Sequence, residues 1–553
     1  MLPFIFLIGS LVFFHELGHF IVARACGVKC ERFAVGIGPV IWSFVRGETE
    51  FSIRALPFGG YVSMLGAQPD EETDEADVGR RLTDKPFWQR FAILFAGPLM
   101  NLLIPIPIYF TMIAGVEGET PAVVGSVFSG SAAEAAGLRS NDRVLSVNGT
   151  PIRFFNELRA AVVGSEGAPL ALTVDRDGKT VEIAATPQVS SSPDRYVKGR
   201  SFSTATLGVS PAAFAAVLNI QRDSAAWNQG LRPFDKVLRV GTTPVRTFYE
   251  FRRELQRCAT PCALQVLRPT RAAEKALELM VQMPVEVVLP GGGRIEQLGI
   301  AAAETSVFDV APGGPAAAAG IAPGDIILSI DGAPVGELST FARRIEAASK
   351  PSFEVRVTRN LEEFKVDYRP VSIWTKDDMG VEQLHLDLGL SAVPGGFAYV
   401  FPEDIPFTGG ERIERAVTGA WSESAGLAVS MVVGVYDMVT GRVSLSNIGG
   451  PVMMAEMANR SASEGLLSYF DMLARVSISL AIMNLLPVPG LDGGQILLFA
   501  AEAISRRPLS FRSRQIVQYV GLASLLALMT LAFVNDLKRH WDAFAQRISS
   551  WFV

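Results

Sequence analysis

Two histidines and a glutamate lie close together in FHELGHF, at residues 14–20. His15 and His19 are four residues apart, so on a helix their side chains share one face, about one turn apart. This spacing lets two imidazoles bind one metal ion, with Glu16 beside them as a general base toward water. HExxH alone recurs by chance, but two of the chain's four histidines lie in this apolar stretch. Because such side chains need partners in lipid, we favour a metal site over a structural histidine pair.

A catalytic zinc needs a third protein ligand and a position open to water. His385 lies in a polar region and His540 beyond the last apolar segment, so neither is well placed. Asp492, in NLLPVPGLDGG (484–494), follows an apolar run interrupted by prolines, and irregular backbone within a membrane must line protein or a water-filled cavity. We predict that Asp492 is the third Zn²⁺ ligand; the alternative is a capping residue that starts the next helix.

The elements that must position these residues are apolar segments of about 20 residues, the length that spans a bilayer. Hydrophobic residues make up 49% of the 553-residue chain, and the mean hydropathy is +0.28. We predict a polytopic α-helical membrane protein with four transmembrane helices, at 1–24, 91–116, 466–491 and 515–535. The first segment lacks the basic start and cleavage site of a secretory signal, so we interpret it as a retained span. Residues 424–436 are too short to cross, so we expect a membrane-surface or re-entrant helix there, and we predict amphipathic helices on the membrane surface over 410–465.

Basic residues indicate the orientation of the chain. They are frequent in the connections 24–90 and 487–515, which we therefore place in the cytoplasm. The large polar insert then lies on the other side, although basic residues in the C-terminal tail favour the opposite arrangement. The net charge of −6 gives no sign of nucleic-acid binding. We predict that the acidic run PDEETDEAD (69–77) is a solvated loop.

The polar insert contains a threefold repeat. Asp142, Asp235 and Asp325 lie 93 and 90 residues apart, each after a helix start and before an apolar strand. We predict α+β units at 120–211, 212–302 and 303–392 that resemble PDZ domains in the permuted form of bacterial proteases. The middle unit is degenerate, with Phe234 where the third has Gly324. PDZ domains capture extended peptides by β-augmentation, and the alternative is a folded spacer or steric cap.

The four cysteines form two CxxxC pairs, Cys26/Cys30 and Cys258/Cys262. In the predicted topology the pairs lie on opposite sides of the membrane, so they cannot share a metal. Cys258 and Cys262 lie outside, where a disulfide is possible, with free thiols as the alternative.

Together, HELGH near the N-terminus, GPLMN at 97–101, the PDZ-like units and NLLPVPGLDGG resemble the site-2 protease family of intramembrane zinc metalloproteases. The similarity covers nearly the whole chain and is greatest to the regulator-of-sigma-E protease branch. It implies that His15, His19 and Asp492 hold zinc and that Glu16 is general base and then proton donor. It also implies substrate handling by Asn484 and supporting roles for Gly97, Pro98 and Asn101. The branch usually carries two PDZ domains, whereas this chain has three units.

The loop 25–90 contains two strand-like runs, 33–44 and 51–65, joined by a polar turn. The resemblance implies a membrane-associated β-hairpin that pairs with the unwound substrate, with Gly59 and Gly60 as supporting positions. A helical substrate hides its peptide bonds, so an open strand edge that stabilises the extended form would help cleavage. An ordinary cytoplasmic hairpin is the alternative.

The expected activity is therefore hydrolysis of peptide bonds within or beside the membrane. The resemblance implies single-span membrane protein substrates, such as anti-sigma factors or remnant signal peptides, and a monomer in the bacterial inner membrane. The PDZ-like units would be periplasmic and exclude untrimmed substrates, while the active site would lie toward the cytoplasm. The alternatives are an inactive family member that retains membrane proteins, a metal transporter and a PDZ scaffold.

Overall fold

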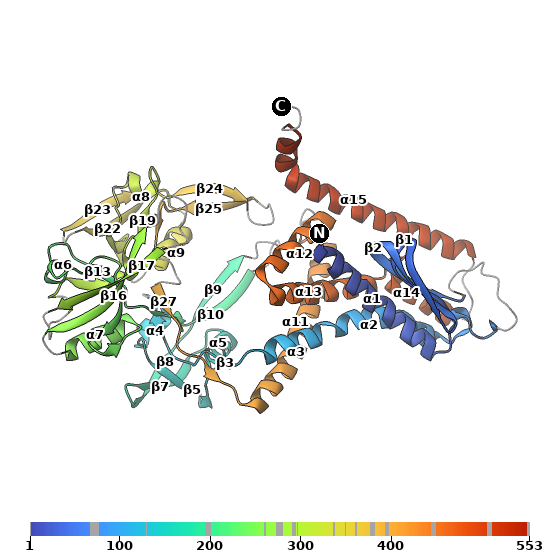
Figure 1. Cartoon of the computed structure of the whole chain (residues 1–553), viewed down its shortest axis with the longest axis horizontal. Coiled ribbons are helices and arrows are strands. Elements are labelled where there is room, and N and C mark those ends of the chain that lie inside the picture. The colour runs from blue at the N-terminus through green and yellow to red at the C-terminus, as the bar shows by residue number, and fades with distance from the viewer. Residues whose placement is uncertain are drawn as a thin grey trace. The chain divides into compact units, whose positions relative to one another are not determined.

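The chain divides into two compact units. The first comprises residues up to Glu117 and from Phe407 onward, and the second comprises Gly118–Pro193 and Ser201–Pro406. The computed structural model (Figure 1) describes residues 2–549 except for 67–76, 129, 194–200, 259–260, 272–279, 290–294, 296, 336–337, 349, 360–361, 377–381, 393–397, 444–448 and 506–510.

The first unit is helical apart from one sheet. Its helices are α1 (Leu2–Ala25), α2 (Phe87–Leu103), α3 (Pro105–Ala114), α11 (Gly409–Val439), α12 (Pro451–Glu464), α13 (Leu466–Leu485), α14 (Asp492–Ser505) and α15 (Phe511–Ser549). Within the described residues, four helical segments are long and apolar enough to cross a membrane: Leu2–Ala25, Phe87–Ala114, Leu466–Leu485 and Gln515–Lys538.

Prolines explain where these helices differ from the predicted spans. The second span consists of α2 and α3, which meet at Ile104 because Pro105 begins α3. The third helix ends at Leu485, six residues before the predicted end at 491, and Pro487 and Pro489 follow it. A proline lacks the backbone N–H that continues a helix, so the chain here becomes irregular.

Helices α1 and α2 run side by side with their backbones in close contact (Figure 1). A Cβ atom on Gly18 would lie 2.2 Å from the carbonyl oxygen of Ala96, so only glycine permits this approach. Leu7 and Leu11 of α1 are fully buried and pack with Ala458 of α12 and Leu473 of α13. These contacts hold one face of the histidine-bearing helix against α2, α12 and α13.

The sheet of the first unit is a long antiparallel hairpin of β1 (Cys30–Arg46) and β2 (Thr49–Met64). Phe33 pairs with both Val62 and Phe51, so the start of β1 lies between two stretches of β2. The hairpin exposes many large apolar side chains: Ile37, Val40, Ile41, Trp42, Phe44, Val45 and Ile53. An exposed apolar surface of this kind is typical of a contact with lipid or with another chain.

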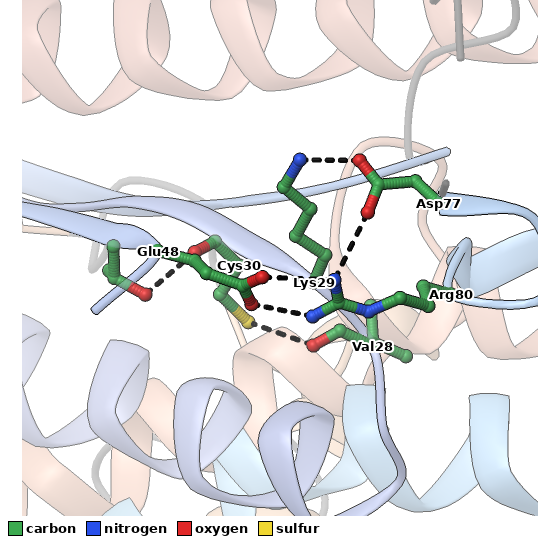
Figure 2. A network of polar contacts seen from close by, with 7 residues as sticks. Val28, Lys29, Cys30, Glu48, Asp77 and Arg80 are labelled. Atoms are coloured by element: carbon green, nitrogen blue, oxygen red, sulfur yellow. Dashed lines mark hydrogen bonds and ion pairs between the residues drawn. The ribbon is translucent and has the colours of Figure 1, made fainter. Parts of the chain in front are cut away.

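A polar network fastens this hairpin to the segment 77–85 that leads into α2 (Figure 2). The Asp77 carboxylate lies 2.5 Å from Lys29 Nζ and 3.1 Å from Arg80 Nη1, and Arg80 Nη2 lies 2.5 Å from Glu48 Oε2. Asp77, from the end of the acidic run, is thus buried in an ion-pair network; residues 69–76 of that run lie outside the described part. Nearby, burial raises the pKa of the Cys30 thiol to about 11, so it stays protonated at neutral pH.

The second unit contains three four-stranded sheets with the same strand order. The first has β5 (Arg143–Val147), β6 (Thr150–Pro151), β7 (Leu170–Arg176) and β8 (Lys179–Ala185). The second has β14 (Lys236–Val240), β15 (Thr243–Pro244), β16 (Cys262–Arg271) and β17 (Met280–Leu289), and the third has β20 (Ile326–Ile330), β21 (Ala333–Pro334), β22 (Phe353–Arg359) and β23 (Glu362–Tyr368). One helix of ten or eleven residues accompanies each sheet: α5 (Phe155–Gly164), α7 (Phe248–Arg257) and α9 (Leu338–Ala348).

Beside each sheet lies the same ion pair between a buried aspartate of the repeat and a partly exposed arginine. The pairs are Asp142–Arg176 at 2.6 Å, Asp235–Arg268 at 2.7 Å and Asp325–Arg359 at 2.7 Å. In each, the arginine also donates to a glycine carbonyl, that of Gly137, Gly230 or Gly320. The degenerate middle unit therefore keeps this contact of its neighbours.

Phe234 of the middle unit has φ +70, a left-handed conformation that costs a bulky side chain energy. Its ring packs edge-on against Phe308, with centroids 5.1 Å apart, which offsets part of that cost. Cys258 and Cys262 form a disulfide, which decides between the two alternatives for this pair, whereas Cys26 and Cys30 are free.

Candidate metal centre

Three buried or largely buried side chains converge in the helical unit. His15 and His19 project from α1, and Asp492 is the first residue of α14. His15 Nε2 lies 3.1 Å from Asp492 Oδ2, and His19 Nε2 lies 3.6 Å from Asp492 Oδ1. The two Nε2 atoms are 3.2 Å apart. Among the described residues, this is a group of donor atoms that could hold one metal ion.

The separations fit zinc. Tetrahedral Zn²⁺ with bonds of about 2.0–2.2 Å places its ligand atoms about 3.3–3.6 Å apart. The three observed separations of 3.1, 3.2 and 3.6 Å lie close to that range. Two imidazoles and one carboxylate also form a donor set found in catalytic zinc sites, with a fourth position left for water or substrate.

The irregular segment between α13 and α14 brings Asp492 to the histidines. A Cβ on Gly493 would lie 2.3 Å from the Leu485 carbonyl oxygen, and one on Gly494 would lie 2.2 Å from that of Val488. The LDGG sequence thus needs both glycines for the chain to fold back tightly on itself. Asp492 both begins a helix and faces the histidines, so its two predicted roles are compatible.

Helix α2 forms one wall of this centre. The carbonyl oxygen of Ile93 lies 2.8 Å from His19 Nδ1, so that nitrogen donates the hydrogen bond and the lone pair of Nε2 faces the centre. A Cβ on Gly97 would lie 2.3 Å from His19 Nε2 and 2.9 Å from His15 Cε1. Pro98 follows, and Asn101, one turn beyond Gly97, places its side-chain amide 3.4 Å from His15 Nδ1.

The profile of peptidase family M50 matches residues 3–528 of this sequence. The chain belongs to that family, the site-2 proteases. It is 27% identical to the regulator of sigma-E protease RseP of Escherichia coli K12, over 97% of this chain and 98% of the relative. The protease RseP of Yersinia pestis matches at the same identity and coverage. NMA0084 of Neisseria meningitidis, whose name describes it as a zinc metalloprotease, is 28% identical over 98% of this chain and 99% of its own.

One solved structure, a PDZ domain protein of Parabacteroides distasonis, covers 48% of this chain at 10% identity and a TM-score of 0.14, too low to define a fold. The family match and the named relatives confirm three predictions: the family, the zinc cofactor and metalloprotease activity. The four apolar helices agree with a membrane protease of this family.

In this protease, Glu16 is half-buried beside His15, and the stretch 60–64 of β2 passes it. A Cβ on Gly60 would lie 3.2 Å from Glu16 Cγ and 2.8 Å from Val12 Cγ1, so glycine lets the strand approach α1 closely. Gly59 has φ +84, a conformation that favours glycine. Both glycines therefore shape the strand next to the metal centre.

Asn484 lies in the last turn of α13, half-buried, on the element that leads into the Asp492 segment. One site residue that sequence reasoning missed is Ile93, which acts through its backbone carbonyl. A carbonyl is present at every position, so no residue type signals such a contact. Arg90 was also missed: it pairs with Glu502 of α14 at 3.3 Å and fastens the Asp492-bearing helix to α2.

Proposed function

We propose that this protease cleaves single-span membrane proteins within or beside the bilayer, using Zn²⁺ held by His15, His19 and Asp492. The observation that carries the proposal is the convergence of these three donor atoms between apolar helices. Zinc in such a site polarises the scissile carbonyl and lowers the pKa of water. All three ligands come from one chain, which supports action as a monomer.

Glu16 acts as general base and then as general acid. It accepts a proton from the water whose oxygen bonds to the carbonyl carbon, and it returns that proton to the amide nitrogen as the C–N bond breaks. Its half-buried place on α1, next to both histidines, suits this proton transfer.

The β1–β2 hairpin presents the substrate. The stretch 60–64 pairs with 30–35 on one side, and no other strand of the described chain pairs with its second edge. An unwound substrate segment adding to that edge would lie next to Glu16, with its backbone hydrogen-bonding groups satisfied. The exposed apolar side chains of the hairpin suit contact with lipid.

The substrate proposed is a single-span protein of the anti-sigma-factor type, with remnant signal peptides as another class. The name of the Escherichia coli relative, regulator of sigma-E protease RseP, supports the first of these classes. The enzyme would lie in the bacterial inner membrane, with the metal centre toward the cytoplasm and the second unit in the periplasm. The disulfide in that unit suits an oxidising compartment.

The test of the proposed chemistry compares the parent enzyme with Glu16→Gln in membranes that contain a single-span reporter protein. Glu16→Gln should lower cleavage by about 10²–10⁴-fold, the contribution typical of a general base, while its zinc content stays equal to that of the parent. His15→Ala should lose the zinc. If Glu16→Gln cleaves the reporter as fast as the parent does, this mechanism is wrong.

We further propose that the three PDZ-like units exclude substrates with an untrimmed outer domain. Their three folded sheets and cores support a steric role. Reporters with outer segments from a few residues to a folded domain test it: the parent should cleave only the short ones, and a chain without 118–406 should cleave all. Equal cleavage of every reporter by the parent would rule out a size filter.

A further inference from the structure

We propose that Asn101 positions His15 for metal binding by accepting a hydrogen bond from His15 Nδ1 through its side-chain oxygen Oδ1. The inference rests on the proposed role of His15 as a zinc ligand. Asn101 would thus be a positioning residue that fixes which imidazole nitrogen carries the proton.

The contact lies in the interior of the helical unit. Asn101 of α2 is fully buried, and its Nδ2 lies 3.4 Å from His15 Nδ1. Its Oδ1 is also buried and is among the few side-chain polar atoms there without a hydrogen-bond partner. A buried amide oxygen without a partner has lost its hydrogen bonds to water without replacement, so this arrangement of the amide is unfavourable.

The position of the proton on the His15 ring determines which atom of the Asn101 amide must face it. A neutral imidazole carries one proton, so a His15 that offers the Nε2 lone pair to zinc carries that proton on Nδ1. With Nδ2 of Asn101 opposite, two N–H groups would face each other at 3.4 Å. A half-turn of the amide presents Oδ1 instead, and the nearly identical shapes of the two amide ends allow this turn within the same packing.

His19 has a partner of the same kind on the same helix. Its Nδ1 lies 2.8 Å from the carbonyl oxygen of Ile93, eight residues before Asn101, with Gly97 midway. Residues at this four-residue spacing share one face of a helix. The face of α2 toward α1 therefore offers one oxygen acceptor to each histidine: a backbone carbonyl for His19 and the Asn101 side chain for His15.

Asn101 also takes part in helix packing, and this second role can be tested separately. Its backbone oxygen accepts a hydrogen bond from Ser477 Oγ of α13 at 2.7 Å, and Ser477 is fully buried. Ser477→Ala removes that link between α2 and α13 without changing any group that contacts His15. It is the matched control for a purely structural effect.

The experiment measures zinc affinity by chelator competition on the full-length protein in detergent, together with the visible spectrum of the Co²⁺-substituted protein. Asn101→Leu is expected to bind zinc about 10–100-fold more weakly, the loss typical when a partner of a metal-bound histidine is removed. Asn101→Ala replaces it if Asn101→Leu does not fold. Asn101→Asp keeps an acceptor oxygen and should stay within a few-fold of the parent, with an unchanged Co²⁺ spectrum. Ser477→Ala should match the parent.

Three results would overturn the inference: parental zinc affinity in folded Asn101→Leu or Asn101→Ala, an equal loss in Ser477→Ala, or an equal loss in Asn101→Asp. Parental affinity in Asn101→Leu or Asn101→Ala would show that Asn101 has no role in zinc binding. An equal loss in Ser477→Ala would assign the effect to helix packing, and an equal loss in Asn101→Asp would show that His15 depends on the amide nitrogen. His15→Ala separates this inference from the proposed function. If His15→Ala keeps full zinc affinity, the ligand set itself is wrong, whatever Asn101 does.

Discussion

The two histidines of HELGH are alike in sequence but not in their surroundings. A backbone oxygen faces Nδ1 of His19, and a side-chain amide faces Nδ1 of His15. Placing either imidazole between apolar helices is costly, and both partners reduce that cost while pointing Nε2 toward Asp492. The short motif therefore depends on α2, which lies more than 70 residues further along the chain.

Gly97 is the position where a single methyl group should close the metal centre. Gly97→Ala would place a Cβ 2.3 Å from His19 Nε2, so the imidazole or the helix must move. Since ligand geometry must hold to a few tenths of an ångström, we expect zinc affinity to fall by at least tenfold and reporter cleavage to be lost with it. Zinc content of the purified protein and cleavage in membranes measure both effects.

Gly9→Ala is the matched control, because Gly9 lies in α1 and no atom lies within 4 Å of its added Cβ. Alanine is the better helix former by about 1 kcal/mol, so this variant should bind zinc and cleave as the parent does. Full zinc binding by Gly97→Ala would show that the two helices are not packed as closely as the structure indicates.

At the scale of elements, the sequence predicted those helices and strands that have a local pattern of residue types. The hairpin, the helix after each repeat and the apolar spans follow from periodicity, turn residues and length. Two features had no such signal: the split of the second span at Ile104 and the fold-back that brings Asp492 to α1. Both depend on contacts between helices that are distant in sequence, which a pattern along one segment does not contain.

The Asp77 network should make the hairpin sensitive to acid. Lys29 lowers the pKa of the Asp77 carboxyl, and Arg80 lowers that of Glu48. A lowered pKa means stabilisation that is complete above the ordinary value of about 4 and is lost as the pH falls through the lowered value. Hydrogen exchange at residues 30–35 and 48–52, corrected for the intrinsic rate, should therefore be slow at pH 7 and accelerate below about pH 4.

Asp77→Asn should exchange faster than the parent already at pH 7 and should respond less to acid. Glu50→Gln is the control. The Glu50–Arg32 pair is longer than the Asp77–Lys29 pair, at 3.6 Å against 2.5 Å, and both of its side chains are more exposed than Asp77 and Lys29. If the parent hairpin is equally protected from pH 7 to pH 3, the network does not fasten it to the segment 77–85.

For the whole molecule, the order of units along the chain was predictable and the arrangement inside the centre was not. The three repeats were visible because one buried aspartate recurs at a nearly constant interval, and each pairs with an arginine 33 or 34 residues later. In each pair the aspartate is buried and the arginine is partly exposed, so loss of the arginine would leave a buried carboxylate without its partner, which explains why a divergent middle unit still keeps the pair. The zinc ligands, by contrast, lie far apart in the sequence; residue types and the broken apolar run proposed Asp492 as the partner of the histidines, but no pattern along the chain gave the distances between them.

The cysteines allow a direct test of the orientation of the whole molecule. With the second unit in the periplasm, Cys258 and Cys262 are oxidised, while Cys26 and Cys30 stay reduced. The triple variant Cys26→Ser/Cys30→Ser/Cys262→Ser leaves one thiol, the half-buried Cys258. A membrane-impermeant maleimide should label it in intact spheroplasts. A second triple variant that keeps only Cys26 should be labelled only after lysis, since the proposed topology puts Cys26, which directly follows α1, on the cytoplasmic side. The reverse pattern would invert the proposed topology and place the PDZ-like units in the cytoplasm, where they could not screen periplasmic domains.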